Sequence, residues 1–220
     1  GVYRTESGKV QQFSAEEMNP ASLSFKIACK DPYWTKISRI KAKWYIKFVL
    51  NGGNPVTGTP YKNWLGIRPV HCREAVALYL NIGYMCTLER FQQRVLTFQG
   101  TLLDNNKNAI DTSKIISRLE NLSGFDIGLV YAGNGVIGLG GGRTWGVYQK
   151  SFLYYYNNRD GCCTTIFHEL GHCLGYNHNS TMTYGKWASG CADVFYKNNI
   201  SDFPVNSHTI LNSRNNPNIY

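Results

Sequence analysis

The sequence lacks several features that would assign it to common classes of protein. No stretch approaches the roughly 18 consecutive apolar residues of a membrane-spanning helix, so we expect none. There is no C-x-x-C pair, which argues against a thiolate zinc site or a redox motif, and no G-x-x-x-x-G-K-[ST] phosphate-binding loop. Charged residues make up 17% and hydrophobic residues 43% of the 220 residues. This balance excludes a disordered chain and predicts one large globular domain, or one domain divided by a cleft.

Acidic residues are the minority, and the formal net charge is +9. The lysines and arginines are dispersed, and the densest run, KISRIKAKWYIK from Lys36 to Lys47, alternates with apolar residues. Such alternation is typical of a half-buried strand with a solvated basic face. We therefore predict no nucleic-acid partner, and leave open a preference for anionic substrates.

Cysteines are numerous for a chain without thiolate motifs, and they predict disulfides in an oxidising compartment. Because their number is odd, at least one is unpaired, and Cys173 is the candidate for the free thiol. Of the adjacent Cys162 and Cys163, we expect at least one to pair elsewhere, with Cys191 as a candidate. The polar start at Gly1 suggests a mature or trimmed secreted protein, which we expect to be a monomer. The seven cysteines are Cys29, Cys72, Cys86, Cys162, Cys163, Cys173 and Cys191.

The most informative stretch is FHELGHCLGYNHNSTMTYG, which contains the pattern H-E-x-x-H-x-x-G-x-x-H. The pattern is filled by His168, Glu169, His172, Gly175 and His178. At this chain's own residue frequencies, five such residues in register arise by chance roughly once in a hundred thousand chains. The spacing is therefore a specific signal, although any single histidine could be an ordinary core residue.

The pattern predicts a metal-binding helix followed by a sharp turn. Positions four apart on a helix point the same way, so His168 and His172 can share one ion, while apolar residues such as Leu170 face the opposite side. Gly175 tolerates the left-handed conformation that ends a helix, which would bring His178 back toward the pair. Three neutral imidazoles and one open position form the ligand set of a catalytic zinc ion (Zn2+). The sequence therefore predicts one catalytic zinc.

Glu169 follows the first histidine and can reach a water bound to the ion. Zinc lowers the pKa of that water to about 7, and a neighbouring carboxylate can take its proton as the water attacks a carbonyl carbon. This arrangement predicts metal-assisted hydrolysis of an acyl bond.

The pattern resembles that of the metzincin clan of zinc endopeptidases, in which a Met-turn follows the third histidine. The resemblance implies zinc ligands at His168, His172 and His178, Glu169 as the general base, and Met182 as the Met-turn residue beneath the metal. Three residues separate His178 from Met182, a shorter connection than in most metzincins. Tyr184 stands where astacin-like and serralysin-like members carry a tyrosine. It is either a zinc ligand or oxyanion hydrogen-bond donor, or an aromatic wall of the cleft.

The order of the segments upstream is similar to that of reprolysin-like metzincins: the pattern F-D-I-G-x-V comes first, then a glycine-rich segment, and then the metal helix. This order implies that the strand after the glycines forms the upper edge of the cleft, where a peptide substrate adds as an extra strand. Its glycines would let the substrate backbone approach closely. A mobile surface loop is the alternative. The predicted edge residues are Ile137, Gly138, Leu139, Gly140 and Gly141.

Weaker patterns predict the other elements. His71, at the start of one predicted helix, is interpreted as a surface or capping residue, and Trp187 as a wall of the specificity pocket. Strands are expected at Ile37 to Leu50, Arg90 to Leu103, Phe125 to Ala132 and Phe152 to Tyr156, and helices at Pro69 to Tyr84 and from an Asp111 cap to Leu122.

Together these features predict an α/β (α+β) metzincin-like fold: a twisted mixed sheet with an antiparallel edge strand and backing helices, above a small irregular lobe. We expect an extension or arm at 1–32 and a catalytic domain at 33–220, with an upper lobe to about 178 and a lower lobe beyond it. The predicted function is a secreted zinc endopeptidase acting on protein or peptide substrates. The alternatives are a zinc-containing scaffold protein without turnover and a zinc hydrolase of non-peptide amides or esters.

Overall fold

A computed structural model of the chain describes residues 2–4, 10–12, 32–154 and 162–205. The chain divides into two compact units, Gly1–Asp31 and Pro32–Tyr220. In the first unit, β1 (Val2–Arg4) pairs antiparallel with β2 (Val10–Gln12). The second unit holds every other described element, including the predicted metal helix. The predicted arm and the two predicted lobes remain predictions.

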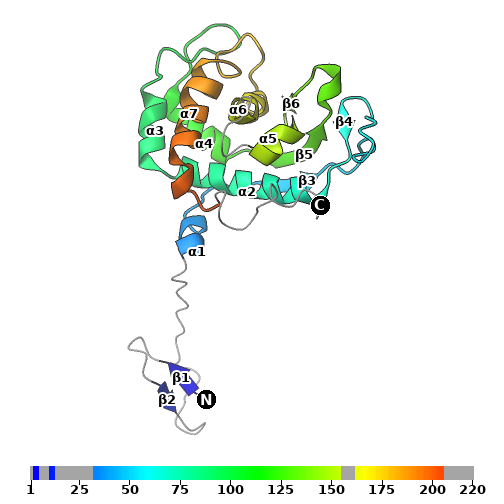
Figure 1. Cartoon of the computed structure of the whole chain (residues 1–220). Coiled ribbons are helices and arrows are strands. Elements are labelled where there is room, and N and C mark those ends of the chain that lie inside the picture. Colours follow the sequence, from blue (N-terminus) through cyan, green and yellow to red (C-terminus); the bar gives the residue numbers. More distant parts are fainter. Residues whose placement is uncertain (1, 5–9, 13–31, 155–161, 206–220) are drawn as a thin grey trace. The chain divides into compact units, whose positions relative to one another are not determined.

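The second unit is built on a five-stranded mixed sheet (Figure 1). The strand order is β3-β5-β7-β6, with β3 and β7 parallel to β5, β6 antiparallel to β7, and β4 pairing with the end of β5. The predicted mixed α/β class and antiparallel edge strand are therefore confirmed. The strands are β3 (Tyr45–Phe48), β4 (Trp64–Leu65), β5 (Gly124–Val130), β6 (Gly138–Gly141) and β7 (Thr144–Tyr148).

The two faces of the sheet differ. Phe125, Ile127, Trp145 and Val147 alternate along β5 and β7 and are buried in the core, which defines the inner face. On the outer face the ring of Trp64 lies so close to Gly128 and Gly146 that an added Cβ at either would come within 2.4 Å of it. The sheet is thus covered on its inner face by helices and on part of its outer face by a single indole ring.

The helices and helical turns of the second unit are short, apart from α2 and α6. They are α1 (Pro32–Ile37), α2 (Pro69–Cys86), α3 (Glu89–Leu96), η3 (Thr112–Lys114), α4 (Ile115–Glu120), η4 (Ala132–Asn134), α5 (Gln149–Tyr154), α6 (Cys162–Cys173), the π-helix η6 (Lys186–Asp193), α7 (Val194–Asn199) and η7 (Ile200–Asp202). No helix in the described ranges combines the length and apolar character needed to cross a lipid bilayer.

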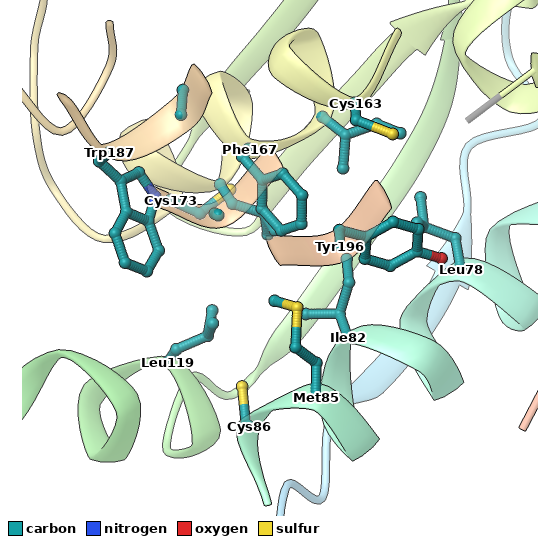
Figure 2. Packing of buried hydrophobic residues seen from close by; sticks show 14 of the residues in the cluster. Leu78, Ile82, Met85, Cys86, Leu119, Cys163, Phe167, Cys173, Trp187 and Tyr196 are labelled. Carbon is teal, nitrogen blue, oxygen red and sulfur yellow. The ribbon is translucent and has the colours of Figure 1, made fainter. Parts of the chain in front are cut away.

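The hydrophobic core lies between α2 and α6. Figure 2 shows Ile82 and Met85 rising from α2 toward Phe167 on α6, with Trp187 and Tyr196 from the C-terminal helices closing the sides. All five side chains are almost completely inaccessible to solvent. Burying large aromatic and aliphatic side chains contributes about 1.5–3 kcal/mol each, so this layer fixes α6 relative to the sheet.

Several sequence predictions of local structure are confirmed. The helix expected from Pro69 forms and runs to Cys86, and the strand expected from Phe125 forms as Gly124–Val130. The Asp111 carboxylate accepts a hydrogen bond from the Ser113 amide and so caps η3, which leads into α4. The strand expected between Ile37 and Leu50 is confirmed only at Tyr45–Phe48, because that is the part that pairs with β5.

Two strand predictions are wrong. The segment expected as a strand from Arg90 to Leu103 begins in helix α3. Phe91 and Val95 lie four residues apart and are both fully buried, so the helical spacing of the apolar residues outweighs their β propensity. Phe152 was expected in a central strand but lies in α5, because β7 already occupies that place in the sheet. Tyr155 and Tyr156, the end of that predicted strand, lie outside the described residues.

His71 is a capping residue, as predicted, but it is buried rather than on the surface. Its Nδ1 accepts a hydrogen bond from the Arg68 amide at the start of α2, and the side chain is 2% exposed. Burial, with a smaller contribution from the Arg68 charge, lowers the pKa of His71 to about 4. His71 therefore becomes protonated near pH 6.5 in the unfolded chain but only near pH 4 in the folded chain.

Acidification should consequently destabilise the protein through His71. Because the pKa of His71 is lower in the folded chain than in the unfolded chain, the stability that neutral His71 contributes is present in full above pH 6.5. This stability is lost as the pH falls toward 4. We expect the free energy of unfolding to fall by about 2–3 kcal/mol more between pH 7 and pH 4.5 in the native chain than in His71→Asn. Asparagine is the matched variant since its Oδ1 can still accept from the Arg68 amide. Urea unfolding with excess chelator measures the difference, and equal losses in both chains would contradict it.

Candidate metal centre and cleft

The predicted metal helix forms as α6 and ends in the predicted turn. Gly175 has φ +94°, in the left-handed region that glycine adopts without strain. Its amide bonds to the His172 carbonyl at 2.9 Å, and the Tyr176 amide bonds to the Gly171 carbonyl at 3.1 Å. This pair of bonds is the Schellman motif, which satisfies the last carbonyls of a helix and reverses the chain. The reversal brings His178 back alongside the helix.

The three predicted histidines converge through their Nε2 atoms. The Nε2 of His172 lies 3.1 Å from that of His168 and 3.0 Å from that of His178. On the other side of two rings, Nδ1 donates to a backbone carbonyl: His168 to Thr183, and His172 to Tyr176 at 2.6 Å. Since each neutral imidazole carries one proton, these bonds leave the Nε2 lone pairs of His168 and His172 facing each other.

Facing lone pairs about 3 Å apart repel one another unless a cation lies between them. Burial, opposed by the bond to Thr183, lowers the pKa of His168, and burial likewise lowers that of His172. Both rings are therefore poor sites for a proton but good donors to a metal. A tetrahedral zinc with Zn–N bonds of about 2.0–2.1 Å would place its ligand nitrogens about 3.3–3.4 Å apart, close to the separations observed. The triad can hold a metal ion.

Glu169 lies beside this cluster with its carboxylate buried. One oxygen is 3.8 Å from His168 Nε2, and the residue is 4% exposed. The side chain packs against β6, where a Cβ added to Gly138 would lie 2.2 Å from Oε1. Burial raises the pKa of Glu169 to about 8. A divalent cation on the histidines would lower that pKa again, because positive charge favours the carboxylate.

Met182 sits in a tight turn despite the short connection from His178. The residue is fully buried in the core, and its amide bonds to the Ser180 hydroxyl at 3.0 Å. A Cβ on Gly171 would lie 2.6 Å from the Met182 carbonyl oxygen, so the turn runs directly against α6. The next residue, Thr183, supplies the carbonyl that orients His168. The turn therefore supports the metal cluster from one side of the helix.

Tyr184 is exposed beside two of the histidines. Its ring centroid lies 4.9 Å from that of His168 and 5.5 Å from that of His178. The ring thus forms one side of the opening above the cluster. These contacts agree with an aromatic wall of the cleft.

A cleft of about 800 Å³ joins the predicted site residues. Its lining includes the segment from Gly135 to Gly140, which contains most of β6, together with Glu169, the three histidines and Tyr184. Within the described part of the chain, β7 is the sole strand paired with β6, so β6 is an edge. Of the predicted edge residues, Ile137 to Gly140 line the cleft, whereas Gly141 ends the strand outside that lining.

Sequence reasoning missed the residues that hold the loop carrying His178. The Asn177 amide donates to the Asn105 side chain at 2.8 Å, and the Thr181 amide donates to the Leu103 carbonyl at 3.1 Å. Lys107 also donates to the Asn179 carbonyl. The run of Asp and Asn from 104 to 108 is a signal for a turn, but nothing in it indicates which loop that turn would support.

Arg118 on α4 is a second residue that the sequence did not indicate. Its guanidinium donates to the Leu174 carbonyl at 2.7 Å and to the Tyr176 hydroxyl, and it stacks over the Tyr176 ring. A cation at a helix C-terminus satisfies a terminal carbonyl and complements the helix dipole. Arg118 therefore fastens the end of α6, one residue from the glycine at which the chain reverses.

Two further predictions fail in this region. Trp187 does not line the cleft but is buried in the core at 1% exposure, because it packs near Phe91 under the C-terminal helices. The five cysteines whose side chains are described are all free thiols, so a Cys163–Cys191 disulfide is not formed. Cys173 is free and buried, as expected. The five are Cys72, Cys86, Cys163, Cys173 and Cys191.

Comparison of the chain with protein-family models, curated proteins and solved structures finds no match to any of them. The arguments about function therefore depend on the residues of the cleft and their geometry.

Proposed function

We propose that this chain is a secreted zinc-dependent endopeptidase of the metzincin type, acting on extended segments of protein or peptide substrates. The observation that carries the proposal is the convergence of three Nε2 atoms within 4.8 Å of one another, beside a buried carboxylate and below an edge strand. Three imidazoles are the ligand set of catalytic zinc in several hydrolases, and imidazole suits zinc better than it suits calcium or magnesium. His168, His172 and His178 would hold the ion.

Zinc, when bound, supplies Lewis acidity and lowers the pKa of a coordinated water to about 7. Glu169 then acts as the general base: its carboxylate takes the proton of the water that attacks the scissile carbonyl carbon. The same oxygen returns that proton to the leaving amine nitrogen, so the carboxylate is regenerated at the end of the cycle. Its burial between α6 and β6 removes competing bulk water and fixes its position.

The edge of β6 provides a place for the substrate backbone. An extended peptide can add to it as an antiparallel strand through main-chain hydrogen bonds, which bind many sequences with similar strength. Gly138 and Gly140 project no side chain toward α6, so the edge lies close to Glu169. Tyr184, which also lines the cleft beside His168 and His178, can donate a hydrogen bond from its hydroxyl to the developing oxyanion.

The direct test combines metal analysis with turnover of casein. The purified chain should contain about one zinc per molecule, degrade casein, lose this activity with 1,10-phenanthroline and regain it when zinc is restored. Zinc without cleavage of casein or of small ester and amide substrates would instead support a scaffold protein. Cleavage of the small substrates alone would indicate a non-peptide hydrolase. No bound metal under any loading condition would contradict all three.

A further inference from the structure

A basic row runs through the segment before β3 and into that strand, which is the edge of the sheet farthest from the cleft. From Arg39 to Phe48, exposed and half-buried residues alternate without a break. Arg39, Lys41, Lys43 and Lys47 all fall on the exposed set, and we call these four residues the basic row. Its remaining exposed position is Tyr45. Neighbours on one face of an extended chain are about 6.6–6.8 Å apart, so Lys41 to Lys47 span about 20 Å.

The direction of the basic row is fixed by its inward neighbours. Trp44 packs edge-on against Tyr79 and Phe125, with ring centroids 5.7 and 5.4 Å apart, and its indole nitrogen donates to the Leu119 carbonyl at 2.9 Å. Ile46 and Phe48 also pack against the core. Because these side chains cannot turn outward, Lys43 and Lys47, which flank Trp44 and Ile46, point toward solvent. Arg39, at the start of the row, lies over the Tyr84 ring of α2, with its guanidinium carbon 5.7 Å from the ring centroid. A rigid row loses little backbone entropy when it binds a partner.

The charges of the basic row are largely uncompensated. None of its four cations forms an ion pair with another described residue at 4 Å or less, unlike Arg143, which is paired with Asp126 at 3.4 Å. Two acidic groups lie near: Asp126 is opposite Lys47 in the β3–β5 register, and Glu120 is close enough to Lys41 to feel its charge. The four cations of the row therefore outnumber the two carboxylates near them, of which Asp126 is already paired with Arg143 and Glu120 is half-buried, so the row has a net positive charge.

We propose that the basic row binds a linear sulfated polysaccharide. A single line of cations, with about 7 Å between Lys41 and Lys43 and about 13 Å between Lys43 and Lys47, matches a chain whose anionic groups repeat along one axis. Single-stranded nucleic acid needs a series of exposed aromatic rings for base stacking, but the row offers Tyr45 alone, which is already contacted by Arg143 at 5.7 Å from its ring centroid. An anionic membrane favours an amphipathic helix with exposed apolar residues, which a strand edge does not provide.

The site is separate from hydrolysis. The strand β3, which carries Lys47 of the basic row, and β6 lie on opposite edges of the sheet, with β5 and β7 between them. Lys47 faces outward, whereas the cleft lies on the inner, α6 side. Binding there would hold the protein on a polyanionic matrix while leaving the cleft open. The proposal therefore stands or falls independently of the proposed peptidase activity.

The test compares two triple variants of the full chain that remove equal charge. Lys41→Gln/Lys43→Gln/Lys47→Gln neutralises the basic row, and Lys62→Gln/Lys114→Gln/Lys186→Gln neutralises exposed lysines elsewhere. Heparin affinity at 0.1 M NaCl should fall at least about tenfold in the first variant, and the slope of log affinity against log salt should decrease by about two. The second variant should stay within about twofold of the native chain. Thermal unfolding of both checks that they fold.

Three results would overturn the proposal. Equal losses in the two variants would show a diffuse effect of net charge. Undiminished binding of desulfated heparin would remove the role of the sulfates. Tighter binding of duplex DNA or of phosphatidylserine vesicles than of heparin, lost in the first variant, would assign the basic row to a different class of partner.

Discussion

Replacing Glu169 by glutamine is expected to reduce the turnover of casein by about 10²–10⁴-fold while leaving zinc binding intact. The amide keeps the shape of the side chain and its packing against Gly138, but it cannot take a proton from water. The three ring nitrogens that would hold the metal are untouched, so stoichiometric zinc in the variant separates loss of the base from loss of the site.

A matched control is Glu120→Gln. Glu120 is another carboxyl whose pKa is raised by burial, but it lies at the end of α4 and does not line the cleft. This variant should retain casein turnover within about twofold, since it removes no group placed in the mechanism. Full turnover by the Glu169 variant, with zinc bound, would rule out the general-base role. Loss of zinc from that variant would instead mean that the carboxylate helps to hold the metal.

Replacing Gly140 by alanine is expected to damage both the fold and the site. A Cβ there would lie 2.5 Å from the Glu169 carbonyl oxygen and 3.0 Å from the His172 Cβ. Because the first of these is backbone, relief requires β6 and α6 to move apart. Overpacking of this kind costs about 1–3 kcal/mol, and a shift of the helix would misplace Glu169 and His172 together. We expect a lower midpoint in urea and at least a hundredfold loss of turnover.

Gly138→Ala provides the informative comparison. Its Cβ would lie 2.2 Å from the Glu169 Oε1 and 2.8 Å from its Cγ, and this side chain can change its rotamer where a backbone carbonyl cannot move alone. The variant should therefore lose turnover with little change in stability and with zinc retained. Thr144→Ala, at an exposed position of β7 that does not line the cleft, controls for mutation of the sheet itself. If Gly140→Ala were as stable and active as the native chain, the close packing of β6 on α6 would be disproved.

The convergence of the three histidines was predictable because the information is local. Spacing of four residues on a helix and a glycine at its end determine where the rings lie, and both features are contained in 11 consecutive residues. The edge strand at Ile137 to Gly141 was predicted from its order relative to other segments, and its place beside Glu169 is set by glycines that permit close approach.

Predictions failed where tertiary contacts decide. The aromatic run at Phe152 has strong β propensity, but its place in the sheet was taken, and it packs as a helix against α2 and α6. Trp187 was expected to line the specificity pocket as part of the lower lobe, yet it lies in the π-helix η6 and is buried in the core. The supporting contacts of Asn105 and Arg118 join residues 72 and 56 positions apart, and no local pattern encodes such pairings.

The two kinds of anchorage in the histidine cluster have a consequence for how metal enters and leaves. His168 and His172 belong to a helix packed into the core, whereas His178 belongs to a surface loop tied down by hydrogen bonds to the 101–108 segment. A bound metal ion would thus be released in two steps. The loop that carries His178 would detach first, and the ion would then dissociate from His168 and His172. The exchange kinetics of the ion would then be governed by a turn more than 70 residues upstream.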